Sequence, residues 1–203
     1  MSVNNEEFLS LISMLYTDNI QVSISDLSKT VTKEKTSYSF DELLLKSIRE
    51  KIEGKCNSHG LVRSKTTKIL SRNMGMYVPE FFTGTPVYSC TYTTEILNPT
   101  KGVILPCHVK VKNKIGLMAH LDIKNKTFIV ALVPFQLPNR GADQETQKNM
   151  IEQAVENSGK NIFVEVVGSK FEMNDKYITV IGNIVEESKF EKFIKSCNKV
   201  SLN

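Results

Sequence analysis

The chain has 203 residues, of which 40% are hydrophobic and 24% are charged, so it is long enough for one larger domain or two small ones packed together. Lysine and arginine exceed aspartate and glutamate by 26 to 22, and the net charge of +4 allows a polyanionic partner without requiring one.

The start of the chain has no basic leader before an apolar run, and no apolar stretch reaches the roughly 18 residues of a membrane span. The cysteines form no C-x-x-C pair, which fits reduced thiols and predicts no disulfide: Cys56, Cys90, Cys107 and Cys197. These features exclude secreted disulfide scaffolds and membrane-spanning proteins, and we expect an intracellular protein without membrane contact.

Residues 8–31 contain short β-branched runs. Ile20, Val22 and Ile24 alternate there with polar residues. This spacing of two predicts a half-buried strand.

The next segment is predicted to be a helix, because the spacing of its apolar residues changes from two to three and four. Ser39 and Glu42 form an S-x-x-E capping box, and Gly54 supplies the stop. Four apolar residues fall on one face of this helix: Leu44, Leu45, Ile48 and Ile52.

Residues 61–96 read as strands, ending in the alternating run VYSCTYTTEI. The segment LNPTKG, at 97–102, then interrupts both periods with Asn-Pro and a glycine. We therefore predict a domain boundary near residue 99, with a first domain at 1–98 and a second at 99–187.

The second domain contains five candidate strands. Glycines lie inside or at the ends of several of them, as in a small, strongly bent barrel: Gly116, Gly168 and Gly182. A helical insertion near 143–157 falls between the third and fourth strands, where five-stranded oligonucleotide-binding barrels often carry a helix. The expected strands are 103–112, 115–121, 127–133, 162–168 and 177–185.

The final segment, 188–203, predicts a terminal helix. Phe190, Phe193, Ile194 and Cys197 follow the spacing i, i+3, i+4, i+7. This apolar face needs a surface to lie on, either the protein's own body or that of a partner.

Motifs of enzymes are missing from the sequence. It contains no P-loop, G-x-G-x-x-G, G-x-S-x-G or H-E-x-x-H, and we expect no catalytic residue and no cofactor. Cys56 and His59 have the spacing of half a zinc site, but no second close ligand pair accompanies them. A buried thiol beside a loop histidine is the simpler interpretation, so no metal is expected.

The stretch HVKVKNKIGLMAHL, at 108–121, alternates basic and apolar residues. In a strand, His108, Lys110 and Lys112 would face one way, while Val109 and Val111 would point toward the barrel core. Together with basic residues nearby, this face is a candidate RNA-binding surface: Lys110, Lys112, Lys114, His120, Lys124, Lys126, Arg140, Lys170 and Lys176.

The same pattern has a second interpretation, in which the lysines only cover the solvent face of a sheet. Binding of single strands needs cations for phosphates and planar side chains for bases. The second requirement is met by few residues, namely Phe128, Phe163, Phe171 and Tyr177. Leu117 and Met118 occupy positions where many such barrels carry an aromatic residue.

Three blocks, read in order, resemble one family: the larger stalk subunit of cellular multisubunit RNA polymerases, the archaeal E subunit and its counterpart in eukaryotic polymerase II. They are LLLKSIREKIEGKCNSHGLV, the run from YVPEFFTGTP through NPTKG to NKIGL, and IFVEVVGSKFEMNDKYITVIGNIVEE. Together they lie within residues 15–187 in the family's order and spacing. The resemblance implies an α+β chain, with an N-terminal α/β tip domain, a five-stranded oligonucleotide-binding-type β-barrel and a C-terminal helix.

The resemblance also implies a function. In this family the tip domain docks on the polymerase core near the clamp, a smaller stalk subunit packs alongside, and the barrel faces the RNA exit path. The implied partners are the clamp-bearing largest subunit, the small sixth-subunit-like chain and nascent RNA, with the smaller stalk subunit as a further candidate. By the match of the tip loop, the expected docking residues are Cys56, Asn57, Ser58, His59, Gly60, Leu61 and Val62.

The chain departs from the family at two places. The joint reads Pro99, Thr100, Lys101, Gly102 and Val103, without the usual aromatic and acidic residues, and ESKFEKF replaces the usual Asp-Tyr-Leu-Gly ending. Such drift indicates a divergent polymerase, for example one encoded by a large DNA virus, working in the nucleus or in host cytoplasm and virion.

Three functions follow as hypotheses. The first is a non-catalytic stalk subunit of a DNA-directed RNA polymerase that contacts nascent RNA. The second is a free-standing single-stranded RNA-binding barrel protein, and the third is an enzyme whose site has no recognisable motif.

Overall fold

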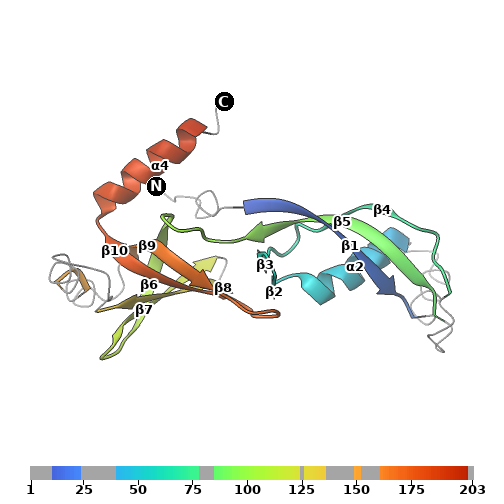
Figure 1. Cartoon of the computed structure of the whole chain (residues 1–203), viewed down its shortest axis with the longest axis horizontal. Helices are drawn as coiled ribbons and strands as arrows, with labels where there is room; N and C mark the ends of the chain where they lie inside the picture. The colour runs from blue at the N-terminus through green and yellow to red at the C-terminus, as the bar shows by residue number, and fades with distance from the viewer. Residues whose placement is uncertain are drawn as a thin grey trace, which may run out of the picture.

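The computed structural model describes residues 11–23, 40–77, 85–123, 126–135, 149–151 and 161–200. In these ranges the chain is mostly β, with an N-terminal sheet, a closed five-stranded barrel and a C-terminal helix. The sheet and the barrel lie end to end along the longest axis of the molecule (Figure 1). No helix in the described ranges is long and apolar enough to cross a membrane.

The N-terminal sheet has the strand order β1-β5-β3-β2, and β4 pairs with β5 beside β3. Strands β1 and β5 are antiparallel over their full lengths, and the alternating burial of β5 confirms the strand expected from VYSCTYTTEI. The bounds are Leu11–Gln21 for β1, Cys56–Asn57 for β2, Gly60–Val62 for β3, Lys68–Arg72 for β4 and Val87–Leu97 for β5.

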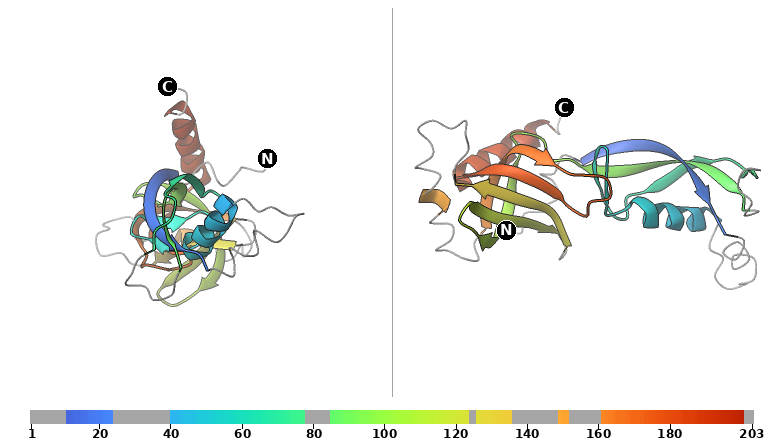
Figure 2. Two further views of the ribbon diagram at one scale, coloured as in Figure 1. Left: turned by 90° about the vertical axis from the view of Figure 1, so that its right-hand side faces the viewer. Right: turned by 60° about the horizontal axis from the view of Figure 1, so that its bottom comes forward.

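Helix α2 (Phe40–Ile52) confirms the expected helix and packs on one face of this sheet (Figure 2). Its apolar stripe contributes Leu44 and Ile48, both fully buried. Gly54, just past the end, has a φ of +71°, a left-handed conformation that glycine adopts without a steric penalty. The expected cap, Ser39, lies outside the described residues. The helix and the sheet share a core made of Ile20, Val22, Leu44, Ile48, Tyr88, Cys90 and Tyr92.

The second half of the chain forms a barrel that closes in the order β10-β8-β7-β6-β9. The β8–β10 pair is parallel and the other pairs are antiparallel, so the five predicted strands and their closure are confirmed. A closed five-stranded barrel agrees with the oligonucleotide-binding type. The bounds are Ile104–Lys112 for β6, Gly116–Ile123 for β7, Lys126–Pro134 for β8, Asn161–Lys170 for β9 and Ile178–Val185 for β10.

Two of the three predicted barrel glycines sit where strands approach closely. A Cβ added to Gly116 would lie 2.3 Å from the carbonyl oxygen of Val133, and one added to Gly182 would lie 2.4 Å from Val164 Cγ1. Gly168 has open space at the same position, so its side of the barrel does not require glycine.

The hydrophobic core of the barrel extends into the N-terminal sheet. Cys56, Leu61 and Leu97 belong to the same buried cluster as the barrel residues. The segment 98–103 connects β5 to β6, and a division of the chain at residue 99 stays a prediction.

Helix α4 (Glu187–Val200) confirms the expected terminal helix. The Phe190 ring stacks on Phe163 of β9, with 4.3 Å between ring centroids, and packs against Ile104. The start of the helix therefore lies on the protein's own barrel, and its later turns extend away from the body (Figure 2). Of the predicted insertion at 143–157, residues 149–151 are helical and Ile151 is buried in the barrel core, while the rest lies outside the described residues.

Candidate nucleic-acid interface and docking surfaces

The predicted basic strand is β6, which forms a hairpin with β7. Val109 lies opposite Ala119 while Val111 lies opposite Met118, so Lys110 is the extra residue of a β-bulge. The bulge breaks the alternation that the sequence predicts. Val109 packs against the barrel core as expected, but Val111 is 42% exposed, so its predicted inward orientation is wrong. The prediction that Lys112 shares a face with His108 is also wrong, because the bulge pairs Lys112 with the buried Leu117.

The bulge directs Lys110 toward a carboxylate. Lys110 Nζ lies 3.6 Å from Asp122 Oδ2, and Thr127 Oγ1 donates a hydrogen bond of 2.7 Å to Asp122 Oδ1. The hydrogen bond from Thr127, and the nearby charges of Lys110 and His120, hold the pKa of Asp122 below its usual value. His108 and His120 lie directly opposite each other beside this pair. Part of the expected cationic surface is thus compensated by Asp122.

The remaining described lysines divide between the two ends of the barrel. Lys112 and Lys114 are exposed at the β6–β7 turn, at the end away from the N-terminal sheet (Figure 1). Lys126, Lys170 and Lys176 lie at the opposite end, because Lys126 lies beside Gly54 and the β9–β10 turn, which the other two flank or belong to, is hydrogen-bonded to Cys56. Two further predicted residues, Lys124 and Arg140, lie outside the described ranges. RNA binding by the predicted basic residues stays a prediction. Those that the structure describes do not form one continuous basic surface.

The aromatic residues expected to stack on bases are mostly engaged elsewhere. Phe163 is stacked on Phe190, and Phe171 packs against the barrel core. Tyr177 is 47% exposed, and the Phe128 ring centroid lies 5.8 Å from Lys126 Nζ. Leu117 is only 2% exposed and belongs to the core, so it cannot face a ligand.

The expected docking segment, Cys56–Val62, forms the β2–β3 hairpin at the junction with the barrel. Cys56 N donates to the carbonyl of Asp175, in the β9–β10 turn, at 2.7 Å, and Asn174 N donates to the carbonyl of Cys56 at 2.8 Å. Cys56, Leu61 and Val62 are buried, Gly60 is also covered and Asn57 is half-buried. Ser58 and His59 are the exposed residues of the hairpin. Docking through this segment stays a prediction, which now depends on those two side chains.

The Cys56 thiol of this hairpin is buried and hydrogen-bonded. Burial, with a smaller effect from the charge of Asp175, raises the pKa of the Cys56 thiol to about 11. The Cys56 Sγ donates to the carbonyl of Tyr177 at 3.8 Å. In the described part of the chain, no group of three His, Cys, Asp or Glu side chains could hold a metal ion.

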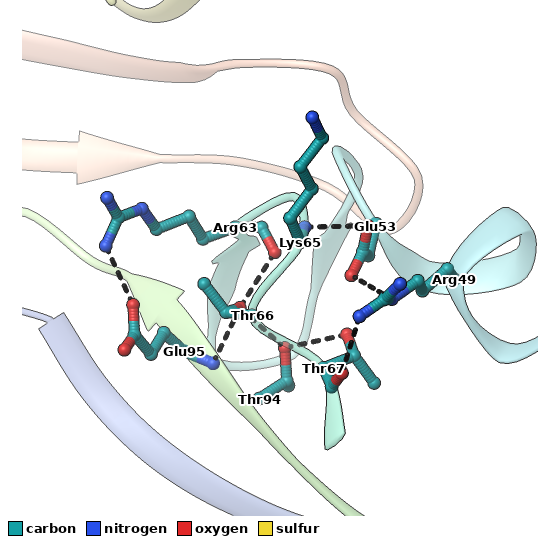
Figure 3. Close-up of polar contacts among 8 residues, drawn as sticks. All are labelled: Arg49, Glu53, Arg63, Lys65, Thr66, Thr67, Thr94 and Glu95. Atoms are coloured by element: carbon teal, nitrogen blue, oxygen red, sulfur yellow. Dashed lines mark hydrogen bonds and ion pairs between the residues drawn. The ribbon is translucent and has the colours of Figure 1, made fainter. Parts of the chain in front are cut away.

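A polar network, which sequence reasoning missed, holds the connection from β3 to β4. Lys65 has a φ of +68°, and its amide donates to Glu53 Oε2 at 2.9 Å. Arg49 lies 3.4 Å from Glu53 and donates to the carbonyl of Thr67 at 3.1 Å, while the Thr67 and Thr94 hydroxyls lie 3.2 Å apart. The network ties the hairpin to α2 and β5, and Figure 3 shows all of its members: Arg49, Glu53, Arg63, Lys65, Thr66, Thr67, Thr94 and Glu95. Its residues are scattered along the chain, so no local pattern indicates it.

A second surface of the N-terminal sheet lies at the end farthest from the barrel. We define the distal patch as Met74, Met76 and Tyr77, which are 97%, 64% and 73% exposed. Met76 forms a bridge with Val87, at the start of β5, which fixes the patch to the sheet. Gly75 between the methionines has a φ of +87° and packs on the Tyr88 ring, where a Cβ would lie 2.5 Å from Cε1. Exposed large apolar side chains in a group are typical of contact surfaces.

Comparisons with known proteins agree with the polymerase interpretation. No family model matches the chain. The sequence is 27% identical, over 151 residues, to a protein of Acanthamoeba polyphaga mimivirus named "Putative DNA-directed RNA polymerase subunit L376", and the match covers 73% of each chain. Most of this chain is therefore similar to a viral protein whose name assigns it to a DNA-directed RNA polymerase.

Proposed function

We propose that this chain is a non-catalytic stalk subunit of a DNA-directed RNA polymerase. It docks on the polymerase core near the clamp through its N-terminal half and contacts nascent RNA through its barrel. The similarity to the mimivirus protein over 73% of both chains carries the proposal. The elongated arrangement of a sheet and a five-stranded barrel supports it, since one end can dock while the other reaches a ligand (Figure 1).

In the described part of the N-terminal half, the distal patch and the β2–β3 hairpin both offer exposed side chains for docking. The distal patch offers three large apolar side chains, whereas the β2–β3 hairpin offers only Ser58 and His59. Burial of apolar area drives most protein association, and methionine adapts well to a partner's surface. We therefore favour the distal patch as the surface that contacts the core, with the clamp-bearing largest subunit and the small sixth-subunit-like chain as partners.

Affinity purification of the tagged full chain, from the cells in which it is made, tests the docking. We expect the two large polymerase chains to co-elute, and recovery to fall at least about tenfold in a Met74→Glu/Tyr77→Glu variant, because each exchange places a charge in an apolar contact. A Ser58→Ala/His59→Ala variant should keep them. If only the Ser58→Ala/His59→Ala variant loses the polymerase chains, docking is through the β2–β3 hairpin. Recovery of the wild-type chain alone would favour the free-standing RNA-binding protein.

RNA contact has its own test. Changing Lys110, Lys112 and Lys114 together to Glu should weaken binding of a single-stranded RNA about tenfold or more at low salt. The slope of log affinity against log salt should fall by roughly 0.7 for each phosphate that the variant no longer neutralises. Lys110 should contribute least, because it already lies beside Asp122. Filter binding or fluorescence anisotropy over a salt series measures both quantities.

The matched control exchanges three exposed lysines of the N-terminal half, Lys46, Lys51 and Lys68, for Glu. It changes the net charge equally, so an equal loss of affinity would show that only the overall charge matters. Unchanged affinity and salt slope in the barrel variant would remove RNA binding from the proposal and leave docking intact.

A further inference from the structure

The outer surface of the barrel carries a continuous row of aliphatic side chains that neither docking on the core nor RNA binding requires. The strand register places Val111 of β6 opposite Met118 of β7, Met118 opposite Leu132 of β8, and Leu132 opposite Ile181 of β10. The bulge at Lys110 is what turns Val111 outward into this row. We call these four residues the aliphatic row.

The row is open to solvent. Val111, Leu132 and Ile181 are 42%, 39% and 43% exposed, and Met118 is half-buried. Ile115, in the adjoining turn, is 81% exposed. A hollow of about 310 Å³ lies over this region and is lined by Met118, Leu132, Ile181, Ile115 and their neighbours in the turn and strands. A contiguous apolar surface of this kind on a folded protein marks a contact site.

The charges beside the row select the partner. Residues 108–122 contain three lysines, two histidines and one acidic residue, Asp122, which forms an ion pair with Lys110. Lys110 borders one side of the row, and Lys112 and Lys114 lie at the turn beyond Val111. Two rows facing each other in a dimer would bring these lysines together, which disfavours a second copy of this chain. An acidic partner is favoured.

The shape of the row favours a helix. Three strand spacings of about 4.8 Å make the row roughly 14 Å long. An amphipathic helix presents apolar side chains at i, i+3, i+4 and i+7 over about 10.5 Å, which fits that length. The row contains no planar ring, so it offers aliphatic packing to apolar side chains and no stacking platform for nucleobases.

We propose that the aliphatic row is the docking site for an acidic amphipathic helix of a partner protein. The helix buries its apolar stripe along Val111, Met118, Leu132 and Ile181, and its carboxylates lie near the exposed Lys112 and Lys114 of the β6–β7 turn, since Lys110 is already paired with Asp122. The site does not depend on the polymerase assignment, and its test uses no polymerase, so either proposal can fail alone.

The test is an NMR titration of the isotope-labelled full chain with a synthetic helical peptide that carries leucines at i, i+3, i+4 and i+7 and glutamates elsewhere. We expect shifts confined to the row and the β6–β7 turn. A Leu132→Glu/Ile181→Glu variant should weaken binding at least about tenfold. If that variant does not fold, Leu132→Ser/Ile181→Ser replaces it.

Two controls separate the alternatives. A Leu15→Glu/Leu70→Glu variant makes equal exchanges at exposed leucines of the N-terminal sheet and should bind like the wild type. A peptide with lysines in place of the glutamates should bind at least about tenfold more weakly.

Four results would overturn the proposal. The first is no shift with the acidic peptide, and the second is binding that the row variant leaves unchanged, which would indicate charge attraction alone. The third is row shifts produced by oligouridylate but not by the peptide, which would assign the surface to nucleic acid. The fourth is concentration-dependent self-association that the row variant abolishes, which would assign the surface to a second copy.

Discussion

Replacing Gly60 with alanine is expected to lower the free energy of unfolding by about 2 to 5 kcal/mol. Gly60 has a φ of +142°, which an L-residue rarely adopts. An added Cβ would lie 2.4 Å from the carbonyl oxygen of Leu97 and 2.9 Å from Ile96 Cγ2. The contact with backbone cannot be relieved by a rotamer change, so β3 must move away from β5 where the N-terminal sheet and the barrel share a core.

Gly102→Ala is the matched control for Gly60→Ala. Gly102 also has a positive φ, of +89°, but nothing lies within 4 Å of an added Cβ. In this variant the free energy of unfolding should fall only by the cost of placing alanine in the left-handed backbone conformation, about 1 to 2 kcal/mol. Urea unfolding followed by circular dichroism measures both. Equal losses of stability in the two variants would show that the close approach of the new Cβ to Leu97 does not add to the destabilisation.

Truncation of Leu121 to alanine is expected to destabilise the chain by about 2 to 5 kcal/mol. Leu121 lies in β7 opposite Ile129 and is fully buried in the core that the barrel shares with Cys56, Leu61 and Leu97. The strands of a closed barrel are held by hydrogen bonds on both sides, so they collapse poorly into the resulting cavity. The loss should therefore lie toward the upper part of that range.

Leu70→Ala tests whether burial is the cause. Leu70 lies in β4 and is 61% exposed. Its truncation should change stability by no more than about 0.5 kcal/mol. Similar losses for Leu70→Ala and Leu121→Ala in urea unfolding would contradict the assignment of the core.

Periodicity predicted most of the elements because each signal is local. The alternating run 87–96 became β5, the apolar stripe of α2 buried Leu44 and Ile48, and the five barrel strands lie within a few residues of their expected bounds. The terminal helix likewise follows from the spacing of Phe190, Phe193 and Ile194, because a period of 3.6 residues aligns them on one face.

Less of the candidate sites than of the secondary structure could be predicted from the sequence. A β-bulge depends on how two strands pair, so the outward turn of Val111 and the ion pair of Lys110 with Asp122 have no local signal. The hairpin at Cys56–Val62 was expected to dock because it resembles a tip loop, but whether its side chains are free depends on the β9–β10 turn, more than a hundred residues away. The distal patch could have been noticed in the run Met74, Gly75, Met76, Tyr77, which has three large apolar residues around a glycine.

By itself, the sequence determined that this protein has a β-rich body with a five-stranded barrel and a terminal helix. The periods of strands and helices are visible in the spacing of apolar residues that lie close together in the chain. Tertiary structure alone decided which side chains meet across strands. Cross-strand register aligned Val111, Met118, Leu132 and Ile181 into one row and divided the lysines between the two ends of the barrel. Register is set by bulges and closure of the whole barrel, so residues distant in the chain become neighbours only when the fold is complete.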